Sequence, residues 1–223
     1  MAHAFFLGVD VHDAATQEVT FVLLEKEKNP GDDAARYRLD HLRHVQELDS
    51  MEALADHLQG LVSEQPYIGR TSLIINRGSE AGQALVDALR DRGLDPVRAT
   101  LTAGGGVPAA ERDEEGVRLG TAGAVQALVE LYRDGRFAVE EHSREGASRL
   151  AREIQHAFEV LDEAEGDQAS GESMGDLQAL REAEPPLTSA ALAAWLGRER
   201  TFDPSKHLKD TPQTGRTRGT AGP

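Results

Sequence analysis

Two polar side chains at the ends of apolar segments are the first candidates for chemistry in this chain. Asp10 ends the largely apolar run 5–9, and Asn76 ends the apolar run 73–75. Carboxylate oxygens are the hard ligands that Mg²⁺ and Mn²⁺ prefer, and an amide carbonyl is a weaker ligand of the same kind. These two side chains can act together only if the segments that carry them become neighbouring strands.

The composition is that of one domain without thiol chemistry. The 223 residues are enough for one substantial core, and the absence of Cys excludes disulfides and thiolate metal sites. No run approaches 18 apolar residues and the N-terminus has no secretory pattern, so we expect a cytoplasmic protein without a membrane span. The net charge of −15 repels nucleic-acid phosphates at long range, although a local basic face remains compatible with DNA binding.

The first hundred residues predict a mixed sheet. Extended patterns at 4–11, 18–25 and 37–45, with a turn signal at 29–32, predict an antiparallel three-strand meander. A helix capped by Asp49 or Ser50, a strand at 71–75, a helix capped by Ser79 and a strand at 96–102 follow. This order predicts two parallel strands joined by a right-handed crossover.

The remaining residues are less regular. We predict a mobile loop at 103–116, a helix at 121–133, a short strand at 135–139 and a long helix at 143–164. From residue 162 the composition becomes acidic and rich in glycine. We therefore predict one domain over 1–161, a flexible acidic linker over 162–186, a short helix over 187–200 and a disordered, mildly basic tail over 201–223.

Over residues 4–160 these patterns resemble, in order, the nuclease domain of phage and prophage terminase large subunits. Gly8-Val9-Asp10 resembles the first strand of that family with its metal-binding Asp, and Ile74-Ile75-Asn76-Arg77-Gly78 resembles the strand and turn around the second acid. Gly135-Arg136-Phe137 resembles the closing strand. The resemblance implies a ribonuclease H-like fold with helices on both faces of the sheet. It also implies Mg²⁺ or Mn²⁺ as cofactor, a role in viral DNA packaging, DNA or a capsid protein as partner, and a place in the host cytoplasm or the virion.

The chain departs from the family pattern at the positions that matter most. The second acid of the family aligns with Asn76, and a common Lys aligns with Thr121. The best third acid is Asp176, within the acidic stretch. The resemblance thus assigns Asp10, Asn76 and Asp176 to the catalytic positions, and Asp10 and Asp176 to the metal, with Glu80 as a substitute ligand. No Gly-x-x-x-x-Gly-Lys-Ser/Thr motif is present, so the ATPase motor of a complete terminase is absent.

Replacing an acid by Asn76 affects the chemistry directly. Two divalent ions about 3.5–4 Å apart repel each other, and several carboxylates must offset that repulsion. An amide in place of one carboxylate removes a full charge, so occupancy of at least one metal position should fall. His12 and Asp13, beside Asp10, are alternative ligands. Simpler roles stay open: Asp10 can end a strand, Asn76 can occupy a turn, Glu80 can stabilise a helix start, and Asp176 can be solvated.

Three functions follow from this sequence. The interpretation that we favour is a terminase-nuclease-like binding module that has lost catalysis, in the manner of a pseudoenzyme. The second is an active Mg²⁺- or Mn²⁺-dependent DNA endonuclease that uses Asp10. The third is an α/β binding protein unrelated to nucleic acids.

Overall fold

The computed structural model describes residues 2–13, 18–28, 34–46, 50–102, 110–139, 146–166 and 184–200. Most of the predicted acidic linker and the whole predicted tail lie outside these ranges. No helix within them is long and apolar enough to cross a bilayer.

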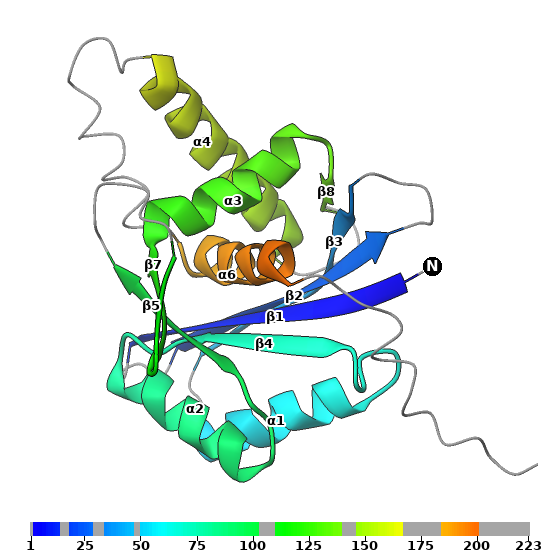
Figure 1. The fold of residues 1–223 in the computed structure, drawn as a ribbon, viewed down its shortest axis with the longest axis vertical. Coiled ribbons are helices and arrows are strands. Elements are labelled where there is room, and N and C mark those ends of the chain that lie inside the picture. The colour runs from blue at the N-terminus through cyan, green and yellow to red at the C-terminus, as the bar shows by residue number, and fades with distance from the viewer. Residues whose placement is uncertain are drawn as a thin grey trace, which may run out of the picture.

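An eight-stranded mixed sheet forms the centre of the molecule (Figure 1). In chain order, its strands are β1 (Ala2–Asp13), β2 (Glu18–Lys28), β3 (Arg36–Val45), β4 (Thr71–Asn76), β5 (Val97–Thr102), β6 (Glu111–Asp113), β7 (Gly116–Gly120) and β8 (Phe137–Ala138). Their order across the sheet is β6-β7-β5-β4-β1-β2-β3-β8. The strands β1, β2 and β3 form an antiparallel meander, whereas β4, β5 and β7 run parallel to β1. The predicted ribonuclease H-like layout is therefore confirmed.

Two helices, α1 (Met51–Ser63) and α2 (Glu80–Asp91), cover one face of this sheet. Each begins at a serine cap: Ser50 Oγ accepts a hydrogen bond from the Ala53 amide, and Ser79 Oγ accepts one from the Gly82 amide, both at 3.1 Å. A Cβ on Gly82 would lie 2.3 Å from the backbone oxygen of Asn76. The glycine therefore lets the start of α2 lie directly against the end of β4.

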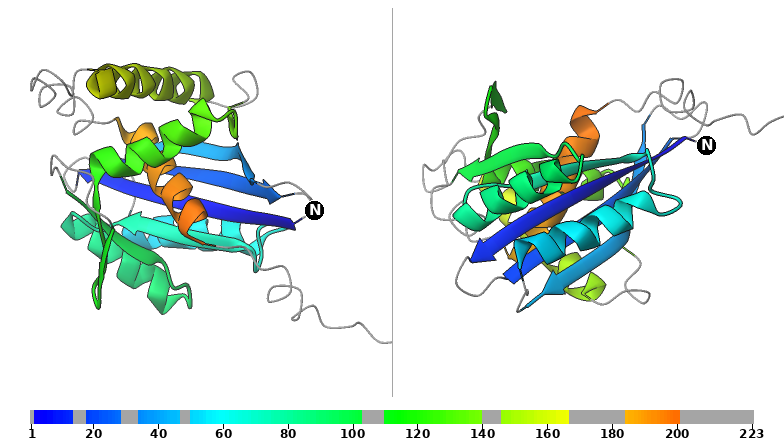
Figure 2. Two further views of the ribbon diagram at one scale, coloured as in Figure 1. Left: turned by 45° about the horizontal axis from the view of Figure 1, so that its top comes forward. Right: turned by 90° about the horizontal axis from the view of Figure 1, so that it is seen from below.

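The opposite face is covered by α3 (Thr121–Arg133), α4 (Ala147–Gly166) and α6 (Pro185–Glu199). The helix α6 lies next to the sheet, across β1 and β2, and α3 and α4 pack outside it (Figure 2). Every residue of α6 from Pro186 to Gly197 is buried. A Cβ on Gly8 of β1 would lie 2.1 Å from the backbone oxygen of Ser189, so this glycine permits the close approach of α6.

Three boundaries differ from the sequence-based expectation. Residues 111–113 are not part of a loop, because β6 pairs with β7 as an antiparallel edge. The helix α4 runs to Gly166, past the domain boundary placed at 161, and α6 begins at Pro185, inside the range expected to be linker. The helix expected as a short terminal element is therefore a central layer of the same core.

Candidate functional site

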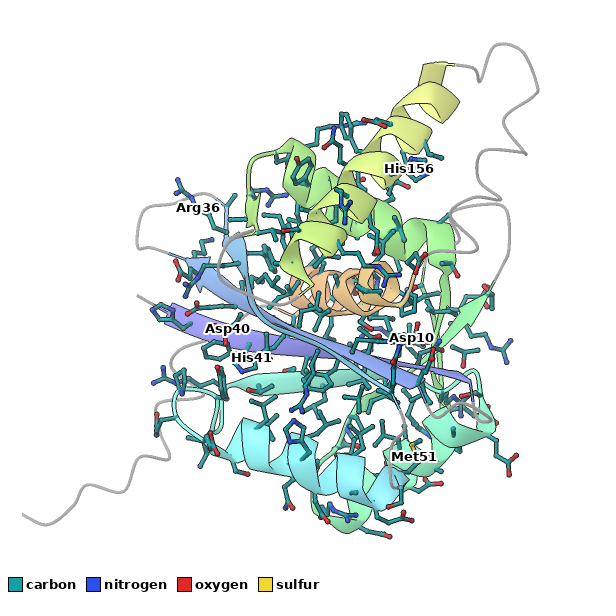
Figure 3. All side chains as sticks on the ribbon, turned by 180° about the vertical axis from the view of Figure 1, so that it is seen from behind. Asp10, Arg36, Asp40, His41, Met51 and His156 are labelled. Atoms are coloured by element: carbon teal, nitrogen blue, oxygen red, sulfur yellow. The ribbon has the colours of Figure 1, made fainter. Side chains whose placement is uncertain are left out.

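The register of β1 and β4 brings Asp10 and Asn76 together. The two strands are parallel neighbours, and these residues are the last pair between them: Asn76 ends β4, whereas β1 continues beside β2 to Asp13. Their side chains point to the face covered by α6, because Ala4, Phe6 and Ile74, at alternate positions of the same strands, belong to the core on that face. Asp10 is buried, with 4% of its surface exposed. Figure 3 shows it at the end of the sheet away from Asp40 and His41 of β3.

Asn76 donates to Asp10 instead of presenting an oxygen beside it. The distance from Asn76 Nδ2 to Asp10 Oδ1 is 2.8 Å, and Asn76 Oδ1 accepts a hydrogen bond from the Gly78 amide at 3.1 Å. A backbone N–H can only donate, so the amide oxygen must face Gly78 and the NH₂ group must face Asp10. Asn76 is the last residue of β4 and not a residue of the following turn. Its side chain bridges both elements.

A hydroxyl group and an imidazole continue the same row across the sheet. Thr20 on β2 is the partner of Asp10, and His44 on β3 is the partner of Thr20, with 2.8 Å between Thr20 Oγ1 and His44 Nδ1. On the face covered by α6, Ser189 Oγ of that helix donates to the backbone oxygen of Thr20 at 2.9 Å. The groups that surround Asp10 in this row therefore add hydrogen-bond donors and acceptors but no second carboxylate.

The other predicted ligands are not assembled around Asp10 in the described part of the chain. Glu80 is exposed at the first position of α2, where its charge suits the positive end of the helix. Within the described ranges, no group of three His, Asp or Glu side chains close enough to share an ion includes Asp10 or Glu80. Asp176 and the side chains of His12 and Asp13 lie outside the described residues. Two closely spaced metal ions do not fit the pair that is described.

Thr121, at the position of the family Lys, has a structural role. Its side chain is buried at the junction of β7 and α3, and Oγ1 donates to the backbone oxygen of Thr102 at 3.4 Å. The hydroxyl group ties the start of α3 to the end of β5, and it brings no positive charge to this end of the sheet.

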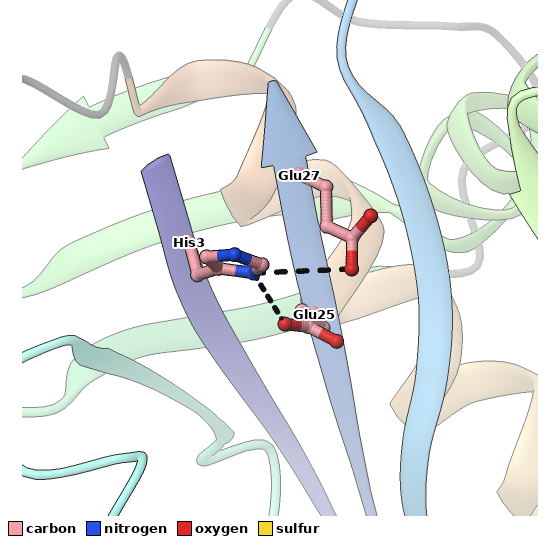
Figure 4. Close-up of side chains that lie close together, drawn as sticks. All are labelled: His3, Glu25 and Glu27. Atoms are coloured by element: carbon pink, nitrogen blue, oxygen red, sulfur yellow. Dashed lines mark hydrogen bonds and ion pairs between the residues drawn. The ribbon is translucent and has the colours of Figure 1, made fainter. Parts of the chain in front are cut away.

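A second cluster, which the sequence analysis missed, joins the start of β1 to the end of β2 (Figure 4). His3 Nδ1 lies 2.6 Å from Glu25 Oε1 and 3.8 Å from Glu27 Oε1. One imidazole and two carboxylates can ligate Zn²⁺ or Mn²⁺. However, Arg38 of β3 donates to the other oxygen of Glu25, and this hydrogen bond raises the pKa of its guanidinium group. Arg38 already supplies a positive charge to the buried Glu25, so the cluster is complete as an ion-pair network.

The sequence contained a weak signal for this cluster. Glu25 and Glu27 follow the apolar run 21–24 and occupy alternate positions of β2, which places both on one face. That His3 of β1 and Arg38 of β3 lie beside these carboxylates follows only from the register of the strands.

Comparison with known proteins identifies no relative: no protein-family model matches the chain, and no curated protein matches it.

Proposed function

We propose that this chain is a terminase-nuclease-like module of a phage or prophage, linked to viral DNA packaging, that binds a partner without cutting DNA. The observation that carries the proposal is the hydrogen bond from Asn76 Nδ2 to Asp10. The lineage itself rests on the ordered motif resemblance, and the ribonuclease H-like sheet is compatible with it.

Charge at the strand tips argues against catalysis. Two-metal hydrolysis needs several ionised carboxylates around the ions. At the described strand tips, Asp10 has a neutral amide as its neighbour on β4 and a neutral hydroxyl on β2. The Asn76 NH₂ group also occupies one lone pair of Asp10 that a bridging ion would need. A single carboxylate engaged in this way gives two divalent cations too little negative charge.

The net charge favours a protein partner over DNA. At −15, the chain repels a duplex at long range, and the two strand partners of Asp10, Thr20 and Asn76, carry no positive charge that would offset this repulsion. A capsid or packaging protein with a basic surface would be attracted by the same field. This partner would place the chain in the host cytoplasm or in the virion.

An active endonuclease is the second candidate, and the burial of Asp10 favours it. A buried carboxylate near the end of a central strand, beside the last residue of the next parallel strand, is placed as a bridging metal ligand would be. In that case an acid outside the described residues, such as Asp176, must complete the centre.

Calorimetry with Mn²⁺ and a plasmid-cleavage assay separate the two functions. We expect wild-type protein to bind no pair of Mn²⁺ ions tightly and to leave supercoiled plasmid intact. We expect the Asn76→Asp variant to gain Mn²⁺ binding. The double variant Asp10→Ala with Asn76→Asp should lack this gain. Two-site Mn²⁺ binding by the wild type, or cleavage that disappears in Asp10→Ala, would overturn the non-catalytic proposal and favour the endonuclease.

A further inference from the structure

We propose that a hollow at the C-terminal end of α6 binds the phosphate groups of a small ligand through four arginines. The hollow has a volume of about 380 Å³ and lies where β5 and β7 begin. Because these strands run parallel to β1, it lies at the end of the sheet opposite Asp10. The arginines come from four separate elements: Arg90 from α2, Arg98 from β5, Arg112 from β6 and Arg200 from the end of α6.

Two of these arginines have no carboxylate partner among the described residues. In the described part of the chain, Arg98 donates to the backbone oxygen of Glu114 and Arg200 donates to Ser72 Oγ, each at 2.8 Å. Both acceptors are neutral. A guanidinium group has five N–H donors, so these bonds leave donors that can reach a ligand. Paired guanidinium donors match the oxygen geometry of a phosphate group.

The other two arginines are only partly neutralised. Arg112 pairs with Glu199 at 2.9 Å, and Arg90 lies 3.7 Å from Asp95, which is 92% exposed. Exposed pairs of this kind are weak, and a better acceptor can displace them. With four arginines and two carboxylates, the lining has a net charge of +2 in a chain whose net charge is −15. This concentration of positive charge distinguishes the hollow from the rest of the acidic chain.

The negative end of the α6 dipole does not oppose an anion here. Lys26 of β2 donates from Nζ to the backbone oxygens of Gly197 and Arg200, at 2.6 and 3.1 Å. The ammonium group thus satisfies carbonyls that a helix end leaves without partners. Lys26 fixes the last turn of α6, which presents Arg200 to the hollow.

The size and charge of the surroundings indicate a small phosphate ligand. A hollow of this volume holds a diphosphate-sized group with part of an attached molecule. A long polyanion would also meet the field of a chain whose net charge is −15, and that field disfavours it. Inorganic pyrophosphate is therefore a suitable probe of the shared phosphate chemistry, and a short single-stranded oligonucleotide tests whether nucleic acid is the source instead.

The chain contains its own reporter for this test. Trp195, the only tryptophan in the sequence, lines the hollow. Titration of the full chain with pyrophosphate at constant ionic strength, followed by tryptophan fluorescence and by calorimetry, should give one saturable site. Arg98→Gln and Arg200→Gln should each weaken binding about tenfold, as expected for the loss of one charge-assisted hydrogen bond. Arg152→Gln on α4, an equal charge change at an exposed position, should bind as the wild type does.

Three outcomes would overturn the proposal. The first is the absence of saturable fluorescence change and of binding heat. The second is equal affinity in Arg98→Gln and Arg152→Gln, with circular dichroism used to confirm that both variants are folded. The third is tighter binding of the oligonucleotide than of pyrophosphate, which would reject the small-ligand assignment. None of these outcomes depends on Mn²⁺ binding, so the test is independent of the proposed function.

Discussion

Replacing Asn76 by Asp should destabilise the protein in a way that depends on pH. The change substitutes a second carboxylate for the NH₂ group that lies 2.8 Å from Asp10 Oδ1. Two charges about 4 Å apart repel by about 4 kcal/mol at an effective dielectric constant of about 20. One carboxyl can instead bind a proton, which costs about 1.4 kcal/mol for each pH unit above its ordinary pKa of about 4. Both limits give a penalty of about 4 kcal/mol at pH 7.

The penalty should shrink as the pH falls. Repulsion raises the pKa of the new carboxyl in the folded state, so the folded state binds more protons than the unfolded state. The Asn76→Asp variant therefore loses stability relative to the wild type as the pH rises from about 4, and it regains this stability as the pH falls. Urea unfolding at pH 5, 6 and 7 should show the difference between Asn76→Asp and wild type growing by about 1.4 kcal/mol per unit.

Two variants control for the lost hydrogen bond. Asn76→Ala removes the donor without adding charge, so its cost should grow less steeply with pH than the cost of Asn76→Asp. The exchange Asp10→Asn with Asn76→Asp keeps one amide and one carboxylate, and the new Asp accepts from the Gly78 amide as Asn76 does. The exchange variant should therefore recover most of the stability that Asn76→Asp loses. A penalty for Asn76→Asp that is equal at pH 5 and pH 7, or an exchange variant no more stable than Asn76→Asp alone, would refute this account of the pair.

Mn²⁺ should stabilise Asn76→Asp but not the wild type. A metal at a hundred times its Kd adds about 2.7 kcal/mol. The thermal midpoint of Asn76→Asp should therefore rise with Mn²⁺ and return with a chelator, whereas the wild-type midpoint should stay unchanged in both conditions.

Three further substitutions test the packing and charge around the sheet by urea unfolding. Gly8→Ala should lower the free energy of unfolding by about 3 kcal/mol, because the added Cβ would lie 2.1 Å from a backbone oxygen of α6. In the control Gly60→Ala, the added Cβ meets nothing within 4 Å, so this change should be neutral or stabilising. Equal effects of the two substitutions would contradict the close approach of α6 to Gly8. Arg38→Met should cost about 1–3 kcal/mol because Glu25, with 8% of its side chain exposed, loses its cation, and an unchanged midpoint would show that the pair is not needed. Burial raises the pKa of Glu153, so Glu153→Gln should gain stability over the wild type as the pH rises above about 4.5; a gain that is constant with pH would contradict this sign.

The elements on either side of β4 could be predicted from local signals, because serine caps and helical spacing define them. The crossover rule pairs β4 with β5. The meeting of Asp10 and Asn76 depends on the pairing of β4 with β1, which only the family resemblance implied. The orientation of the Asn76 amide could not be predicted, because it depends on a backbone donor in the turn that follows.

The place of α6 in the core was predicted poorly for a physical reason. Its sequence follows an acidic stretch, which indicated a peripheral helix, yet no charged residue occurs from Pro185 to Gly197. A helix that is apolar on all sides is normally buried on all sides. That absence of charge was the stronger signal. By contrast, β6 consists of three charged residues at the edge of the sheet, and nothing in its composition indicates a strand.

Asn76 compensates the buried charge of Asp10 by a hydrogen bond, as a bound cation would do by its charge. A buried carboxylate such as Asp10 is costly unless a donor or a positive charge compensates it. In a two-metal centre the ions provide that compensation, so the unloaded site carries uncompensated repulsion. Here the chain of hydrogen bonds from the Gly78 amide to Asn76 and on to Asp10 provides it from within the backbone. The strand tips can then stay together without metal, which is a property that a binding module needs and a metal-dependent nuclease does not.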